Sequence, residues 1–396
     1  MPTNDTTRRS KALEALNISS DHKLILSLDG GGIRGILTLQ LLKKIEEIAQ
    51  MPCYELFDMV AGTSTGGIIA GLFAASKSAI EVEKLYKKLV TKVFKKRDWK
   101  ANRFLNPPLY DKENYRTALK DLIGNISMEE AVQQSKVDLL ITAKDITAGE
   151  EAFFGCFIDM ENTTIGTYKD VLLRSVMEAT MSAPTYFTPL ERFVDGGSTT
   201  YNNPTLSAIM EAVHYGPKNK YDLDKLTVFS FGTGTTVQYI KPDQTYNPKG
   251  IDAMFWLNLI MAESSRDASD MQNNLIRSGL IPQLDYRRFQ ISFDQAAIHK
   301  IPNKSIAEID NTKEDWLWDL TNEELLGIEL DDVGRFPLME IIGQSMTEFI
   351  MQSGGAFKND LCDSIKKRDL LVTSFGDVAR IKAQMKDPDW LDNYES

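Results

Sequence analysis

A run of three glycines between a strand pattern and a helix pattern is the feature that most restricts the fold of this chain. The stretch LILSLDGGGIRGILTLQLL, residues 24–42, opens with a short apolar strand pattern and continues with apolar residues at helical spacing. A strand that enters a helix through so tight a turn is typical of a parallel α/β sheet. Gly30, Gly32 and Gly35 also have the G-x-G-x-x-G spacing of a dinucleotide-binding loop.

Strand and helix patterns alternate beyond this loop. Further strand patterns are YELFDMVAG (54–62), KVDLLITAKDI (136–146), ERFVDGG (191–197) and KLTVFSFGTGT (225–235). We therefore predict an α/β fold with a mostly parallel central sheet and helices on both faces. Residues 1–22 are expected to be a polar leader with a short helix over 8–16. Residues 23–396 are expected to be one domain, with a motif-bearing core over about 24–235 and a more helical, acidic part over about 250–396.

Composition excludes several classes of protein. The 396 residues carry a formal charge of −11 and a pI of about 5.0, which argues against a nucleic-acid polymer as partner. Three scattered cysteines without C-x-x-C spacing argue for a reducing compartment and against a disulfide framework or a zinc site. Because neither a secretory leader nor a long apolar run is visible, we expect a cytoplasmic protein. No calcium-loop pattern occurs, and we expect no metal or cofactor.

The sharpest motif is AGTSTGG, in which Gly62 to Gly66 read G-x-S-x-G around Ser64. A strand pattern precedes it and a helix pattern follows, which is the setting of a nucleophile elbow. The glycines permit a tight turn that lifts the serine hydroxyl above the sheet. A plain helix-capping turn is the alternative, and the flanking elements favour the nucleophile.

The glycine loop and the serine are expected to lie side by side, because parallel neighbouring strands end at the same edge of a sheet. Consecutive glycines expose their backbone amides, and with the cation of Arg34 these amides can then stabilise the oxyanion of an acyl intermediate. A dinucleotide site would instead need an acidic residue at the end of the second strand. Glu55 and Asp58 come too early for that role.

A serine nucleophile needs a base. His22 is expected at the opposite edge of the sheet, His214 at the far end of a helix, and His299 has no predictable place. Asp195, at the end of the strand pattern ERFVDGG, is the carboxylate alternative. The alternative for Asp195 is a purely structural role in an Asp–Gly turn. A catalytic triad in the order Ser…Asp…His, with His214 or His299, also stays open.

Asp29 and Asp145 are rival carboxylates that we rank below Asp195. A carboxylate with an ordinary pKa of about 3.9 is a weak base, so it can serve only by direct contact with the serine in a sheltered site.

Five blocks, in this order, resemble the patatin-like phospholipases: DGGGIRG, GTSTGG, MSAPTYFTP, VDGGSTTYNNP and FSFGTGT. The resemblance covers roughly 24–235, and YRRFQ extends it weakly. It implies a Ser–Asp dyad without histidine, with Ser64 as nucleophile and Asp195 as general base. It also implies an oxyanion loop of Gly31, Gly32 and Arg34, supported by the motif glycines Gly30, Gly35, Gly62, Gly66, Gly196 and Gly197. The aspartate block reads D-G-G rather than D-G-A, which is an accepted variant.

The resemblance implies hydrolysis of acyl esters of membrane phospholipids without a metal, by a bacterial-type intracellular member of the family. Some such members degrade membranes in anti-phage defence after activation by a cyclic nucleotide, although no motif here indicates a messenger site. A homo-oligomer is compatible with the resemblance but no motif specifies one. The alternatives are a nucleotide-binding protein that uses the glycine loop, and a catalytically silent lipid-binding or storage protein of the same fold.

Two stretches bear on contact with lipid. VEKLYKKLVTKVFKKRDWK, residues 82–100, is a basic amphipathic helix pattern with lysines at 84, 88, 92 and 95. An interfacial patch aided by Trp99 and Phe104 is one interpretation, and we favour a surface helix with a solvated lysine face. MFWLNLIMA, residues 254–262, is apolar enough to line an acyl-chain channel, and we favour a core helix.

Overall fold

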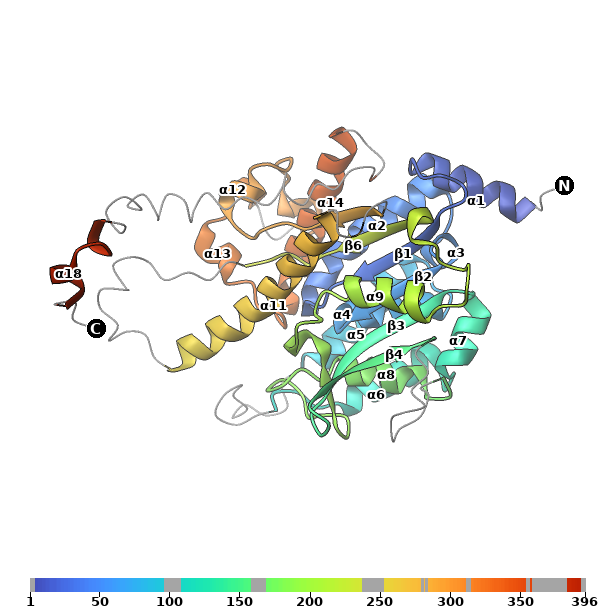
Figure 1. Cartoon of the computed structure of the whole chain (residues 1–396), viewed down its shortest axis with the longest axis horizontal. Coiled ribbons are helices and arrows are strands. Elements are labelled where there is room, and N and C mark those ends of the chain that lie inside the picture. Colours follow the sequence, from blue (N-terminus) through green and yellow to red (C-terminus); the bar gives the residue numbers. More distant parts are fainter. Residues whose placement is uncertain are drawn as a thin grey trace.

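A seven-stranded sheet organises the chain in the computed structural model, with the order β4-β3-β2-β1-β6-β7 and with β5 paired to β3 (Figure 1). The structure describes residues 4–95, 108–157, 169–236, 253–278, 281, 284–310, 315–353, 357 and 383–392. Trp99 and Phe104 lie outside these residues. Among the described residues, no helix combines the length and the apolarity needed to cross a bilayer.

Most of the strand pairs are parallel. The strands that run in one direction are β1 (Lys23–Leu28), β2 (Met59–Thr63), β3 (Asp138–Asp145), β6 (Leu226–Phe231) and β7 (Asp285–Phe289). Two strands are antiparallel to β3, namely β4 (Glu150–Gly155) and β5 (Phe193–Asp195). The predicted fold class, a mostly parallel sheet with helices, is confirmed.

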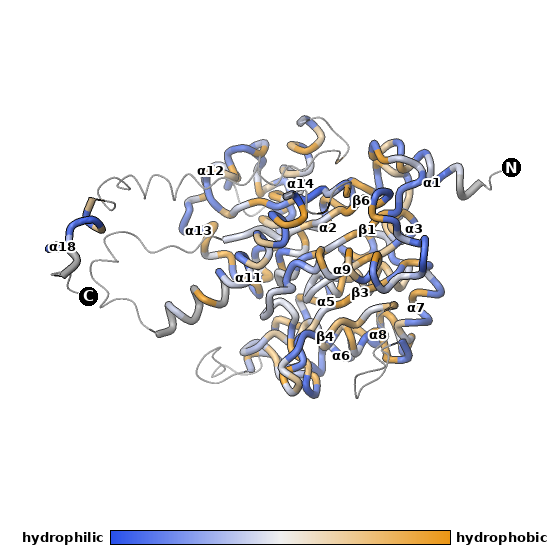
Figure 2. Tube along the Cα trace, viewed as in Figure 1, coloured by the Kyte–Doolittle hydropathy of each residue, from blue (hydrophilic) through white to orange (hydrophobic). Residues whose placement is uncertain are grey.

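Alternate residues of the central strand β1 are buried on opposite faces of the sheet. Leu24 and Leu26 join the hydrophobic cluster that contains Ile36 of the following helix, whereas Ile25 joins a second cluster with Ile209. A strand buried on both faces needs a continuous apolar run, which KLILSL supplies. Figure 2 shows the hydrophobic residues gathered in the sheet and in the helices packed against it.

Helices cover both faces of the sheet. The larger face carries α2 (Gly35–Ala49), α4 (Thr65–Ala74), α5 (Ala79–Val93), α8 (Leu173–Thr180) and α14 (Phe336–Gln352), with α1 (Asn4–Ala15), α6 (Glu113–Ile123) and α7 (Met128–Ser135) packed outside them. The other face carries α9 (Thr205–Met210), which packs on β1 and β2 and is contacted by α11 (Ala253–Arg277). Shorter helices are α3 (Cys53–Leu56), α12 (Gln295–Ile298), α13 (Asn322–Leu326) and α18 (Pro388–Asp392).

Two expectations need correction, and one strand direction was not predicted. The strand predicted over 54–62 begins only at Met59, because Cys53–Leu56 form the single helical turn α3 after Pro52. The strand that carries Asp195 is antiparallel to its neighbour β3. Residues 254–262 belong to α11, but Trp256 and Ile260 are 46% and 59% exposed, so these two side chains do not make it a core helix.

Candidate active site

Ser64 lies at the turn between β2 and α4 in a backbone conformation that side chains rarely adopt, with φ 53° and ψ −121°. Its amide donates to Thr180 Oγ1 at 2.7 Å, and that hydroxyl donates in turn to the Thr142 carbonyl at 2.7 Å. These bonds hold a strained turn that otherwise costs about 1–3 kcal/mol. The structure therefore has the nucleophile-elbow geometry that the G-x-S-x-G motif predicts.

Glycine at 62 and 66 is required by close backbone approach. A Cβ at Gly62 would lie 2.2 Å from the Gly66 carbonyl oxygen, and a Cβ at Gly66 would lie 2.2 Å from the Leu28 carbonyl oxygen. Backbone atoms cannot yield to such contacts as a flexible side chain can. The two glycines thus allow β2, α4 and the end of β1 to meet closely enough to raise Ser64.

Asp195 faces Ser64. The Ser64 hydroxyl donates to Asp195 Oδ2 at 2.6 Å, and the Gly197 amide donates to Asp195 Oδ1 at 2.6 Å. β5 aligns Asp195 with Ala143 of β3, while Thr63 is aligned with Thr142 from the other side. The sheet register therefore brings the carboxylate to the elbow although the two residues are 131 positions apart.

Burial raises the pKa of Asp195 to about 7, against the smaller opposing effects of the bonds from Ser64 and Gly197. The side chain is 5% exposed, and no cation pairs with it among the described residues. A carboxylate with a pKa near neutrality is a far better proton acceptor than an ordinary one. Burial thus makes Asp195 a stronger base than an aspartate with an ordinary pKa.

The glycine loop has all three of its carbonyl groups engaged. Gly30 O accepts from Thr233 Oγ1 at 2.8 Å, and Gly31 O accepts from the Arg34 amide at 3.1 Å. Gly32 O accepts from the Tyr86 hydroxyl at 2.5 Å and from the Thr65 hydroxyl at 2.9 Å. By contrast, the amides of Gly31 and Gly32 donate to no acceptor among the described residues. The loop is held by its oxygens and leaves two N–H donors free.

Arg34 follows the glycine loop, and its guanidinium carbon lies 5.7 Å from the centre of the Phe293 ring. Its Nε has no hydrogen-bond partner among the described residues. Burial lowers the pKa of Arg34 to about 10, so the side chain stays charged at neutral pH. An ionised group with an unused donor can interact with an anionic intermediate or substrate group.

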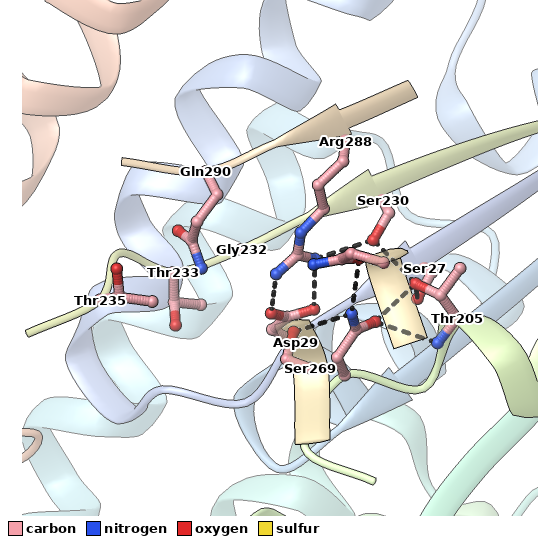
Figure 3. Close-up of polar contacts among 12 residues, drawn as sticks. Ser27, Asp29, Thr205, Ser230, Gly232, Thr233, Thr235, Ser269, Arg288 and Gln290 are labelled. Atoms are coloured by element: carbon pink, nitrogen blue, oxygen red, sulfur yellow. Dashed lines mark hydrogen bonds and ion pairs between the residues drawn. The ribbon is translucent and has the colours of Figure 1, made fainter. Parts of the chain in front are cut away.

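Figure 3 shows a buried ion pair between Arg288 and Asp29, the residue that precedes the three glycines. Arg288 of β7 donates to Asp29 Oδ1 at 2.8 Å and to Asp29 Oδ2 at 2.5 Å, and it also donates to Ser230 Oγ at 2.8 Å. The Ser230 hydroxyl is bonded to Thr205 Oγ1 at 2.8 Å, which reaches Ser27 at 2.9 Å. This network ties the first residue of the loop to β7, β6 and α9.

A cavity of about 540 Å³ opens over Ser64 and Asp195, within the range of about 300–1,000 Å³ that is usual for small-molecule sites. Gly31, Gly32 and Arg34 line it as well. One part of the wall is apolar, formed by Phe94, Met181, Tyr186, Phe187, Leu326 and Ile328. Another part is polar and includes Thr233, Ser269, Asn273 and Gln290.

None of the three histidines lines this cavity. His22 is bonded to Thr227 at the start of β6, at the opposite edge of the sheet. His214 is exposed beside Tyr215, and His299 is exposed and bonded to the Trp318 carbonyl at 3.0 Å. The structure thus does not bring a histidine to Ser64.

The rival carboxylates are engaged elsewhere. Asp145 pairs with Arg192 at 2.7 Å and accepts from the turn that follows it, and Asp29 pairs with Arg288. In the described part of the chain, no cluster of three or more histidine, cysteine or acidic side chains is arranged to hold a metal ion.

Several supporting residues escaped the sequence analysis. Thr180 precedes the MSAPTYFTP block, Thr233 lies within FSFGTGT, and Arg288 lies within YRRFQ. Each block was noted, but nothing in a linear pattern says that a threonine hydroxyl bonds a distant amide or carbonyl. Tyr86 is hidden in the same way, inside an ordinary amphipathic helix.

A mostly parallel sheet with a serine on a strand-to-helix elbow places the domain in the class of α/β proteins built around a nucleophile elbow. Residues 26–209 match the patatin-like phospholipase family, and the chain therefore carries a patatin-like phospholipase domain.

Curated relatives agree with this family. The chain is 27% identical over 345 residues to the calcium-independent phospholipase A2-gamma of Mus musculus, covering 82% of this chain and 40% of the relative. It is 35% identical over 240 residues to the 85/88 kDa calcium-independent phospholipase A2 of Mus musculus, covering 56% of this chain and 28% of the relative. It is 29% identical over 247 residues to a cGAMP-activated phospholipase of Escherichia coli, covering 59% of this chain and 66% of the relative. The chain thus spans less than half of the length of the two mouse relatives.

Proposed function

We propose that this protein is a serine lipid acyl hydrolase of the phospholipase A or lysophospholipase type, acting on membrane phospholipids through a Ser64–Asp195 dyad. The observation that carries the proposal is the 2.6 Å bond from the Ser64 hydroxyl to Asp195 inside a partly apolar cavity. The phospholipase relatives support a lipid ester as the substrate. No cofactor or metal enters the proposed chemistry.

The proposed reaction has two halves. Asp195 accepts the Ser64 proton as Oγ attacks the ester carbonyl carbon, and the amides of Gly31 and Gly32 with Arg34 stabilise the resulting oxyanion. The intermediate collapses, the C–O bond to the alcohol breaks, and Asp195 returns its proton to the leaving lysolipid. Water then attacks the acyl-enzyme, giving its proton to Asp195, and the fatty acid leaves as Ser64 is re-protonated.

The alternatives have less support. A nucleotide-binding loop needs a ribose-binding acid at the end of β2, where Thr63 and Ser64 lie instead. A silent lipid-binding protein would have no need for a strained serine that donates to a buried carboxylate of raised pKa.

Regulation and location are part of the proposal. The cGAMP-activated relative supports activation by a cyclic nucleotide. A role in membrane degradation during anti-phage defence, which the family resemblance implies, stays a prediction. We further propose a cytoplasmic protein in transient contact with the membrane surface. Self-association stays a prediction, which light scattering on the purified protein checks.

The test is release of fatty acid from mixed phospholipid vesicles, with and without cGAMP, alongside labelling by a fluorophosphonate probe. Wild type should label at Ser64 and release fatty acid, and Ser64→Ala should do neither. Mass spectrometry of the labelled peptide identifies the modified residue. Wild type that neither labels nor releases fatty acid in either condition would overturn the proposal.

Thr233→Val should lower kcat by about tenfold with little change in KM, because the Gly30–Gly31 peptide, whose N–H is a proposed oxyanion donor, loses the bond that holds its carbonyl. Complete loss of one oxyanion donor costs about 100- to 1,000-fold, so a misaligned donor should cost less. Initial rates with a soluble ester measure the effect. Thr233→Ser, which keeps the hydroxyl, is the matched control and should stay close to wild type. Equal loss of kcat in both variants would point to packing instead.

A further inference from the structure

Three lysines share the outward side of α5, and a fourth follows the end of the helix. Lys84, Lys88 and Lys92 are spaced by four residues and therefore lie on one side of α5, and Lys95 comes two residues after its last residue, Val93. These four residues are here called the lysine stripe. All four are exposed. The opposite side is buried against the domain through Tyr86, Leu89 and other apolar residues of the core.

The lysine stripe lacks acidic partners. In the part of the chain that the structure describes, none of its members forms an ion pair. Lys87, one residue away on the flank of the helix, pairs with both Glu83 and Glu340. Glu81 is nearest the stripe in the first turn, and its carboxylate is already engaged in the Ser78 capping box. Four uncompensated cations thus lie together on a chain whose formal charge is −11.

The helix leads from the far edge of the sheet toward the cavity. α4 begins at Thr65, directly after Ser64, and runs away from the site, and α5 returns, so that its C-cap residue Phe94 lines the cavity wall. The Phe94 ring lies 5.2 Å from the Tyr110 ring and 6.1 Å from the Phe187 ring. Lys92 and Lys95 therefore flank, in sequence, a residue of the apolar wall.

We propose that the lysine stripe is a docking surface for a bilayer that contains anionic phospholipid, and that it holds the cavity against the lipid surface. The inference rests on the proposed function, because a lipid substrate must pass from a bilayer into the cavity. A protein of net charge −11 is repelled by anionic bilayers over most of its surface, so attraction has to come from a local basic side. Each lysine near such a surface increases partitioning by about fivefold.

The experiment measures sedimentation with vesicles of phosphatidylcholine, with and without phosphatidylglycerol. All proteins carry Ser64→Ala so that the vesicles stay intact. The test variant replaces the four stripe lysines with glutamine. The matched control replaces four other exposed lysines without ion pairs in the described residues, Lys120, Lys136, Lys169 and Lys218, which changes net charge equally. Binding is repeated at high salt, where attraction between exposed charges is screened.

The parent should bind the vesicles that contain phosphatidylglycerol and lose that binding at high salt. The stripe variant should bind them at least about 100-fold more weakly, and the control should bind like the parent. Equal binding by the stripe variant would overturn the proposal, as would an equal loss in both variants or salt-independent binding. If the stripe bound a protein partner instead of lipid, the stripe variant would bind the vesicles as well as the parent does.

Activity separates this inference from the proposed function. With Ser64 restored, the stripe variant should hydrolyse a short soluble ester at the wild-type rate while losing activity on anionic vesicles. A chain that binds anionic vesicles through the stripe but hydrolyses no ester would overturn the proposed function and leave the docking surface intact. Equal losses on the soluble ester and on vesicles would contradict the docking role.

Discussion

Asp195→Asn is expected to reduce ester hydrolysis by about 10,000-fold, comparable to losing the orienting carboxylate of a serine triad. Asparagine has the same shape and can still accept from the Gly197 amide, but it cannot take the Ser64 proton. Initial rates and fluorophosphonate labelling measure the loss. Asp145→Asn, which alters the rival carboxylate, is the control and should keep wild-type rates of ester hydrolysis and of labelling. The dyad is wrong if Asp195→Asn labels at the wild-type rate.

The same carboxyl predicts the pH profile. Because only ionised Asp195 can accept a proton, kcat/KM should rise with pH along a single acid limb centred near 7, the raised pKa of this group. An acid limb near pH 4 would contradict the burial argument. The limb should persist in Asp145→Asn, whose carboxyl is paired with Arg192.

Stability should change with pH in the opposite direction. The pKa of Asp195 is higher in the folded state than its ordinary value of 3.8, so its stabilising effect is present below pH 4 and is lost as pH rises through about 7. The difference between these two pKa values corresponds to a change in the free energy of unfolding of about 4 kcal/mol. Asp195→Asn should therefore be more stable than wild type at pH 8 and not at pH 4, as measured by denaturant unfolding. An equal difference in stability between the variant and wild type at pH 4 and at pH 8 would show that burial does not perturb the pKa of Asp195.

Arg288→Met is expected to lower the free energy of unfolding by about 3–5 kcal/mol, because it leaves the Asp29 carboxylate buried without its cation. Both groups are almost fully buried, at 1% and 4% exposure, and the contact is bidentate. Denaturant unfolding at pH 8 measures the effect. The oxyanion loop begins at Asp29, so kcat should also fall.

The double variant Asp29→Asn/Arg288→Met provides the control for that prediction. Removing both charges should cost less than removing the cation alone, because no uncompensated charge stays buried. Burial raises the pKa of Asp29 and Arg288 opposes this, so loss of Arg288 should raise it further. The single variant should then lose less stability at pH 5, where Asp29 is more readily protonated, than at pH 8. A single variant as stable as wild type would mean that the pair does not hold the loop.

Local patterns were sufficient where short-range physics decides the structure. The strand before DGGGIRG, the helix after it and the elbow at Ser64 follow from apolar spacing and from glycine turns. The boundary at Met59 was missed because a single helical turn, Cys53–Leu56, has too few residues to show a period. The prediction of a core helix over 254–262 was wrong for Trp256 and Ile260, because apolar content does not say whether another element covers a helix.

The position of Asp195 shows the limit of sequence reasoning. The sequence predicts Asp195 at the end of a strand but not the direction of that strand, and in the structure it lies at the end of β5, which is antiparallel to β3. Strand direction depends on how the intervening chain returns to the sheet, which no residue pattern near Asp195 records. The structure nevertheless brings Asp195 to the Ser64 side of the sheet.

The sequence by itself determined the α/β class, the serine elbow and the glycine loop, because each depends on residues within one turn of the chain. Only the tertiary structure decided which carboxylate meets Ser64, how Thr233, Tyr86 and the Asp29–Arg288 pair hold the loop, and how burial raises the pKa of Asp195. Those features depend on sheet register and on desolvation, which arise only when distant segments pack together.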